Sequence, residues 1–157
     1  MRHNVAPASL SIKIVTGLIL LLTGGMLAGA FFIPVLLWGG LFLVIIDVFC
    51  YLSAPIAYEF NGNKLMVISR MDKKIFGPVL SCSLIGEEKP AFSIRLWGNG
   101  GLFAGTGIFW NKKYGVFRAY VSTGERSKLT LIETPNSKVI ITPENPKDFL
   151  ANATYNG

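Results

Sequence analysis

The stretch that decides the fold runs from Ile14 to Tyr58 and reads IVTGLILLLTGGMLAGAFFIPVLLWGGLFLVIIDVFCYLSAPIAY. Its one formally charged residue is Asp47. A single helix needs about 20 apolar residues, at about 1.5 Å each, to cross about 30 Å of hydrocarbon. The stretch is about twice that long, and only helices or closed barrels satisfy their backbone in lipid. Because nothing in it alternates like a barrel strand, we predict a hairpin of two membrane helices.

Pro34 marks the expected break between these helices. Proline lacks an amide hydrogen, disfavours helix at the residue before it, and fits the first turn of a following helix. We therefore predict spans near residues 13–31 and 34–55, which makes 13–55 the hairpin and 1–12 an N-terminal tail. A cleaved signal peptide has an apolar core of about 7–15 residues followed by polar chain. Here the apolar run continues, so we expect both helices to be retained.

Basic residues flank the hairpin and are absent from its turn. Those before it are Arg2 and Lys13, and those after it are Lys64, Arg70, Lys73 and Lys74. The positive-inside rule places such ends in the cytoplasm. We therefore expect a protein integral to the inner membrane, with both termini and the polar domain on the cytoplasmic side. The two cysteines lie far apart in the chain, Cys50 in the second span and Cys82 beyond it, and imply no disulfide framework.

Small residues in the first span suggest a helix-packing surface. Gly25 and Gly29 have the small-xxx-small spacing that lets two helix backbones approach closely in lipid. We expect this surface to pack within the hairpin, with Gly39 and Gly40 of the second span as its receivers. Self-association of two chains through the same surface is the alternative.

Asp47 is the other notable residue of the hairpin. An ionisable group within a span costs a few kcal/mol and usually marks a polar interior or a partner contact. A structural role is the main expectation, in which Thr16 or Thr23 of the first helix hydrogen-bonds the carboxylate. A contact between subunits and the conduction of ions or protons are the alternatives.

From about Glu59 the composition changes to that of a polar, strand-rich domain. Asn61-Gly62-Asn63 is a strong turn signal. The predicted strands are Lys64–Ser69, Lys74–Leu80, Phe92–Trp97, Ile108–Trp110, Val116–Ser122, Leu129–Thr134 and Lys138–Thr142. Glycine and proline turns separate them, which favours an antiparallel sandwich or small barrel. Asn145 as N-cap and Pro146 at the first helical position predict a short C-terminal helix, with Phe149 docking on the sheet.

Several motifs of this domain resemble a known family. Residues 95–103 read RLWGNGGLF, residues 115–120 read GVFRAY, and residues 142–149 read TPENPKDF. They are similar to the R-L-x-G-x-G-G-L-F, G-x-F-x-A-Y and S-P-D-D-P-x-x-F patterns of bacterial pleckstrin-homology (PH) domains. Thr142 and Asn145 replace serine and aspartate but preserve the capping chemistry, while residues 79–90 depart from the family's I-P-L-x-x-I pattern.

The resemblance implies a mainly-β domain behind a membrane α-hairpin. Its expected form is a PH-like barrel of about seven antiparallel strands with a C-terminal helix, over residues 56–153, followed by a tail at 154–157. Membrane helices ahead of the domain also suit the family. The resemblance implies a fold and a class of protein rather than a reaction.

The glycine-rich segment Arg95–Gly107 does not fit a nucleotide-binding loop. No lysine follows its glycines as a phosphate-binding loop requires, and the residues after it favour a strand where a dinucleotide fold needs a helix. A structural loop with glycines at positive φ is the main expectation. The alternative is a loop that contacts the membrane or a protein, because Trp and Phe residues surround it and prefer the bilayer interface.

Catalytic and metal-binding constellations are missing from the sequence. The only histidine, His3, lies in the expected N-terminal tail, which argues against a histidine-based triad and a histidine-rich metal site. Two distant cysteines cannot build a structural zinc site. We therefore predict a protein that is not an enzyme and that has no catalytic residues, no metal and no cofactor.

Net charge points to the partner class. Without Arg2, Lys13 and Asp47 the chain has thirteen Lys and Arg against eight Asp and Glu, and no basic helix or RNA-binding motif appears. We expect a membrane-anchored cytoplasmic interaction or scaffolding module that associates with itself or binds a protein, and no nucleic-acid partner. The alternative is a peripheral sensor of anionic lipid that uses basic loops. Candidate contact residues are Arg70, Lys73, Lys74, Arg95, Trp97, Phe103, Lys112 and Lys113.

Overall fold

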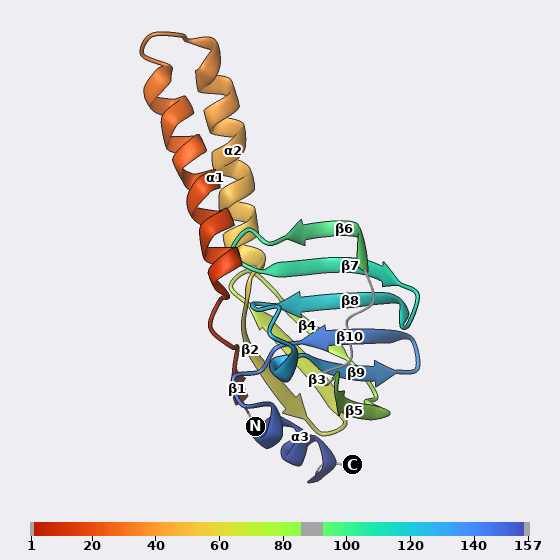
Figure 1. The fold of residues 1–157 in the computed structure, drawn as a ribbon. Coiled ribbons are helices and arrows are strands. Elements are labelled where there is room, and N and C mark those ends of the chain that lie inside the picture. Colours follow the sequence, from red (N-terminus) through yellow and green to blue (C-terminus); the bar gives the residue numbers. More distant parts are fainter. Residues whose placement is uncertain (1, 86–92, 156–157) are drawn as a thin grey trace.

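The computed structural model describes residues 2–85 and 93–155 of the chain. The helices are α1 (Leu10–Gly29), α2 (Val35–Ser53) and α3 (Pro146–Tyr155), with a 3₁₀ turn η1 (Arg126–Lys128). The strands are β1 (Arg2–Asn4), β2 (Pro55–Asn61), β3 (Lys64–Ser69), β4 (Lys73–Phe76), β5 (Ser81–Leu84), β6 (Ser93–Gly100), β7 (Gly105–Asn111), β8 (Gly115–Val121), β9 (Thr130–Thr134) and β10 (Ser137–Ile141). Figure 1 shows α1 and α2 as a hairpin that projects from a β domain.

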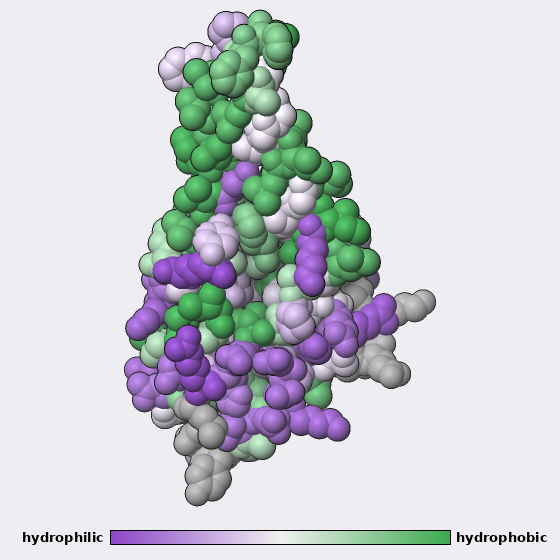
Figure 2. Space-filling view, turned by 90° about the vertical axis from the view of Figure 1, so that its left-hand side faces the viewer, coloured by the Kyte–Doolittle hydropathy of each residue, from purple (hydrophilic) through white to green (hydrophobic). Residues whose placement is uncertain are grey.

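The hairpin has the length and the surface of a membrane element. Helices of 20 and 19 residues rise about 30 Å at about 1.5 Å per residue, the thickness of a hydrocarbon core. Only 6% and 17% of their apolar windows are buried, whereas the core helix of a soluble protein is mostly buried. Hydrophobic residues cover the hairpin and hydrophilic residues gather on the β domain (Figure 2). The two helices could therefore span a membrane.

The helix boundaries differ slightly from those predicted. The first helix begins at Leu10, where the Lys13 amide donates to the Ser9 carbonyl, so Lys13 lies inside it. The second helix ends at Ser53 because Ala54 precedes Pro55 and adopts an extended conformation, with φ −63° and ψ 133°. The predicted break at Pro34 is present, since Pro34 is the N-cap of α2.

The N-terminal residues do more than form a tail. Arg2–Asn4 is strand β1, which pairs antiparallel with β2 so that Arg2 faces Glu59 and Asn4 faces Ala57. The Ala6 amide then donates to the Thr142 carbonyl at 2.9 Å. Because β1 precedes the hairpin and β2 follows it, both ends of the hairpin lie on the same side of any membrane that it crosses.

The β domain consists of two sheets. One has the order β1-β2-β3-β4 and the other has the order β5-β9-β10-β8-β7-β6. Their strand pairs are antiparallel except for β8 and β10, which run parallel. Among the predicted strands, the one at Lys64–Ser69 has the observed bounds, while Phe92 and residues 86–90 of the divergent segment 79–90 lie outside the described residues. Strands β1, β2 and β5 were not predicted.

A shared core holds the two sheets and α3 together. Its fully buried members include Tyr58 of β2, Ile132 of β9 and Phe149 of α3. The Tyr58 hydroxyl donates to the Tyr120 carbonyl at 2.6 Å, which satisfies its polar tip inside the core. The predicted helix from Pro146 is confirmed, and Phe149 docks on the sheet as expected. Two N-terminal helices, a mainly-β domain and a C-terminal helix are the fold class that the sequence indicates.

Candidate functional site

Tyr51, in the last turn of α2, joins the hairpin to the β domain. The Arg70 guanidinium lies 4.2 Å above its ring, and Nη1 of Arg70 donates to the Tyr51 carbonyl at 3.4 Å. The Phe103 ring meets the same tyrosine edge-on, at 5.4 Å between centroids. A cation at a helix C-terminus also offsets the unpaired carbonyls there. Two of the predicted contact residues, Arg70 and Phe103, therefore serve the joint.

Backbone hydrogen bonds reinforce this joint. The Phe103 amide donates to Oγ1 of Thr16 on α1 at 2.9 Å. The Met71 amide donates to the Leu52 carbonyl at 3.1 Å, and the Ser9 amide donates to the Ser122 carbonyl at 3.1 Å. Both helices are thus tied to separate loops of the domain, which holds the domain in one orientation relative to the hairpin.

The glycine-rich segment is built around two glycines that face each other across β6 and β7. Gly98 and Gly107 are paired and have φ values of 109° and 147°. A Cβ on Gly98 would lie 2.6 Å from the Cα of Gly107, and one on Gly107 would lie 2.9 Å from the Cα of Gly98. Only glycine allows this approach. The expected glycines at positive φ are present, but Gly98 and Gly107 lie in strands β6 and β7 rather than in a loop, and only residues 101–104 connect the two strands.

These glycines form part of a groove beside the end of α2. The groove has a volume of about 600 Å³. Its walls come from α2, from β4 and from the face shared by β6, β7 and β8. The lining residues are Phe49, Cys50, Ser53, Lys74, Arg95, Leu96, Trp97, Gly98, Asn99, Thr106, Gly107 and Tyr120.

The described lining of the groove contains two cations and no carboxylate. Lys74 holds its ammonium 5.5 Å from the Tyr120 ring centroid, while Arg95 places its guanidinium group against Gly100 of the same strand. Asp47 lies one turn before Cys50, but its carboxylate meets Thr23 on α1. The groove is therefore electropositive next to an apolar helix.

Strand β6 presents apolar side chains next to this groove. The exposed fractions are 46% for Ile94, 55% for Leu96 and 78% for Trp97. It is the edge strand of its sheet, and it is the strand nearest to the projecting end of the hairpin (Figure 1). Of the predicted residues, Lys74, Arg95 and Trp97 meet at this place.

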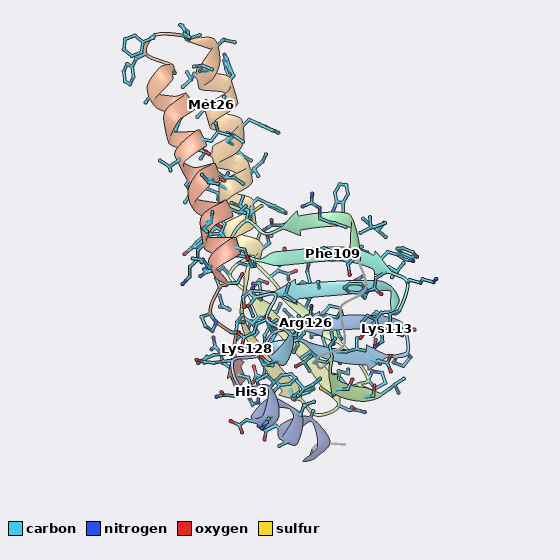
Figure 3. All side chains as sticks on the ribbon, viewed as in Figure 1. His3, Met26, Phe109, Lys113, Arg126 and Lys128 are labelled. Carbon is cyan, nitrogen blue, oxygen red and sulfur yellow. The ribbon has the colours of Figure 1, made fainter. Side chains whose placement is uncertain are left out.

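The remaining predicted cations lie elsewhere. Lys112 and Lys113 occupy the turn between β7 and β8, at the end of the sheet away from the hairpin, where Figure 3 labels Lys113. The Lys113 ammonium lies 5.4 Å from the Tyr114 ring. Lys73 is exposed on β4, beside Lys74 in sequence but outside the groove lining. The structure therefore divides the predicted contact set into separate places.

Inside the hairpin, Asp47 has the structural partner that the sequence predicted. Oγ1 of Thr23 donates to Oδ2 of Asp47 at 2.9 Å, and both side chains are buried. Oδ1 of Asp47 has no hydrogen-bond partner among the described residues. Thr16, the other predicted donor, is instead the acceptor for Phe103.

The structure agrees with the glycine packing prediction at Gly39 and Gly40, which contact α1, and differs from it at Gly25. A Cβ on Gly25 would meet nothing within 4 Å, so Gly25 is not part of the interface between the helices. The close contacts are made by side chains of α1 on glycines of α2: Met26 packs on Gly39, and Leu27 packs on Gly40. Gly29 lies near the turn, where a Cβ would be 3.0 Å from Leu36. Large side chains of α1 therefore fill the gaps left by glycines of α2.

Comparison with known proteins agrees with this architecture. The family model described as a bacterial PH domain matches residues 57–156. The chain belongs to the bacterial PH domain family. The match begins within β2 and extends through α3, and so spans the β domain that follows the hairpin. A search of curated proteins and a search of solved structures gave no match.

Membership of the bacterial PH family supports an interaction module, and PH domains are typically non-enzymatic. Among the described residues, no group of three His, Cys, Asp or Glu side chains could hold a metal ion. Sequence reasoning missed Tyr51, Thr106 and Tyr120 as members of the joint and the groove. An aromatic residue in the last turn of a span was a usable signal for Tyr51, but the other two lie in ordinary strand patterns.

Proposed function

We propose that this bacterial PH domain is a membrane-anchored interaction module whose β6 edge lies against the surface of the bilayer that holds the hairpin. The observation that carries the proposal is the position of β6. Leu96 and Trp97 of this strand are exposed and line the groove beside the last turns of α2, where a spanning helix leaves the hydrocarbon. Tryptophan prefers this interfacial depth.

The joint at Tyr51 supports a contact that is maintained rather than occasional. A domain held by Arg70, Phe103 and Thr16 keeps β6 at one height along the hairpin. The free edge of β6 also faces the side on which the hairpin projects. A second copy anchored in the same membrane would not approach from that side, so lipid is the better partner for this edge than strand addition between copies.

The proposal includes the orientation of the chain. Because β1 pairs with β2, both ends of the hairpin lie on the same side of the membrane, so the location of one end gives the location of the other. The basic residues on either side of the spans favour the cytoplasm for these ends. A cysteine introduced at the exposed Gly124 should react with an impermeant maleimide in inside-out vesicles only. Labelling in right-side-out vesicles would contradict this orientation.

Quenching of tryptophan fluorescence by brominated lipid tests the contact directly. The chain has Trp38, Trp97 and Trp110, and phenylalanine at two of them leaves a single reporter. In vesicles with bromine near the headgroups, we expect strong quenching of Trp97. Trp38 on α2 is the positive control for insertion, and Trp110 on β7, further from the hairpin, is the comparison within the domain. Unquenched Trp97 in vesicles that quench Trp38 would refute the bilayer contact.

A further inference from the structure

We infer that the groove between α2 and β6 binds the headgroup phosphate of one anionic phospholipid. The inference rests on the proposed function, because that function places the mouth of the groove at the depth of the lipid headgroups. It adds a defined site with its own residues, distinct from a general contact between a strand and the bilayer. Lys74 and Arg95 are its phosphate-binding cations.

The size and the walls of the groove suit a lipid rather than a small anion. A volume of about 600 Å³ exceeds what a free phosphate fills. One wall is the apolar end of α2, at Phe49 and Cys50, which continues directly into the lipid-facing surface of the hairpin. An acyl chain can follow this wall while its headgroup remains between β4 and β6.

The glycine pair lets β6 and β7 approach closely where they line the groove. At Gly98 and Gly107 the surface is bare backbone, and any side chain there would collide with the neighbouring strand. The polar neighbours at this part of the lining are Asn99 and Thr106. Asn99 is occupied by its own loop, since its Oδ1 accepts the amides of Gly101 and Leu102. Lys74 and Arg95 are the charged groups of the described lining and can select an anionic ligand.

Charge selects an anionic lipid. With two cations and no carboxylate in the described lining, a zwitterionic headgroup gains less than phosphatidylglycerol, whose net charge is negative. Each basic residue near an anionic headgroup contributes about 1 kcal/mol. Removing both charges should weaken binding by roughly tenfold to thirtyfold.

The test is a titration of the detergent-solubilised full chain with short-chain phosphatidylglycerol. We expect saturable binding of one lipid per chain, with weaker binding of short-chain phosphatidylcholine. The double variant Lys74→Gln and Arg95→Gln should lose affinity as stated. The matched control, Lys112→Gln with Lys113→Gln, removes the same charge from the far turn and should bind like the wild type. Equal loss in both variants, or no loss in the groove variant, would overturn the inference.

Two further arms separate the alternatives. Ser53→Phe keeps both cations but fills the groove from α2, so it should abolish saturable binding; wild-type affinity in this variant would overturn the site. Inorganic phosphate should bind far more weakly than the lipid, and equal affinity would indicate a site for a free anion. Quenching of Trp97 in the same variants reports the bilayer contact separately. If a variant shows no lipid binding in the groove but Trp97 is still quenched, the groove site is refuted and the bilayer contact stands.

Discussion

Thr23 and Asp47 form the one side-chain hydrogen bond that the structure describes between α1 and α2, 2.9 Å from Oγ1 to Oδ2. The same hydroxyl lies 3.0 Å from the Ile19 carbonyl within its own helix. The carboxylate is buried, so it depends on this single donor among the described residues. The bond locks the register of the two helices near the middle of the hairpin.

Replacing Thr23 alone should destabilise the hairpin more than replacing Thr23 and Asp47 together. Thr23→Val leaves Asp47 without a partner, and we expect a loss of about 1–3 kcal/mol in the free energy of unfolding. Thr23→Val combined with Asp47→Leu should recover most of that loss, because neither polar group then remains unpaired. Unfolding of the full chain in mixed micelles measures both. A double variant less stable than Thr23→Val alone would contradict this account.

Two variants of Tyr51 distinguish the contribution of its ring from that of its hydroxyl. Tyr51→Phe keeps the ring that Arg70 and Phe103 contact, so hydrogen exchange in the 100–104 loop should remain slow. Tyr51→Leu removes both ring contacts, and we expect the loop to open more easily by about 1–2 kcal/mol. Hydrogen exchange measured by mass spectrometry on the full chain provides the comparison. Similar exchange in both variants would show that the backbone hydrogen bonds alone hold the joint.

The sequence predicted those features that depend on local chemistry. The long apolar run predicted the two helices, and Pro34 predicted the break between them. Gly62, with φ 58°, lies in the predicted turn. The capping residues around Pro146 gave the last helix. Periodicity, proline and glycine act within a few residues, so one sequence is enough to detect them.

Features that depend on distant partners were missed. Strand β1 has only three residues, and its pairing with β2 is visible only once the hairpin folds back. The small-residue spacing at Gly25 suggested a packing surface, but spacing does not determine which side of a helix meets its neighbour. The groove brings together residues from α2, β4, β6, β7 and β8, and no local pattern reports such an assembly.

The glycine pair on β6 and β7 should tolerate no side chain. Gly98→Ala and Gly107→Ala each place a Cβ against the backbone of the other strand at a positive φ. We expect each to lower the free energy of unfolding by more than about 2 kcal/mol. Gly124→Ala is the control, since a Cβ there meets nothing within 4 Å. Thermal unfolding followed by circular dichroism distinguishes them, and equal midpoints for all three variants would contradict the packing argument.

His3 makes the attachment of β1 sensitive to pH. Its ring meets Phe149 edge-on at 5.1 Å, and Nε2 accepts a hydrogen bond from the Asn152 amide at 3.3 Å, as only the neutral ring can. Burial lowers the pKa of His3 below its ordinary value of 6.5, although Asp148 acts in the opposite direction. The unfolded chain therefore binds more protons than the folded chain in this range.

Stability should accordingly fall as the pH drops through 6.5, and it should level off below the lowered pKa of the folded state. His3 is the only histidine of the chain, so its imidazole NMR signals can be assigned without ambiguity. We expect a midpoint below 6.5 in the folded chain. The variant His3→Gln should lose the pH dependence of unfolding between pH 5 and pH 7, roughly the range in which histidine titrates. A midpoint at or above 6.5 would show that the negative charge of Asp148 outweighs burial at this site.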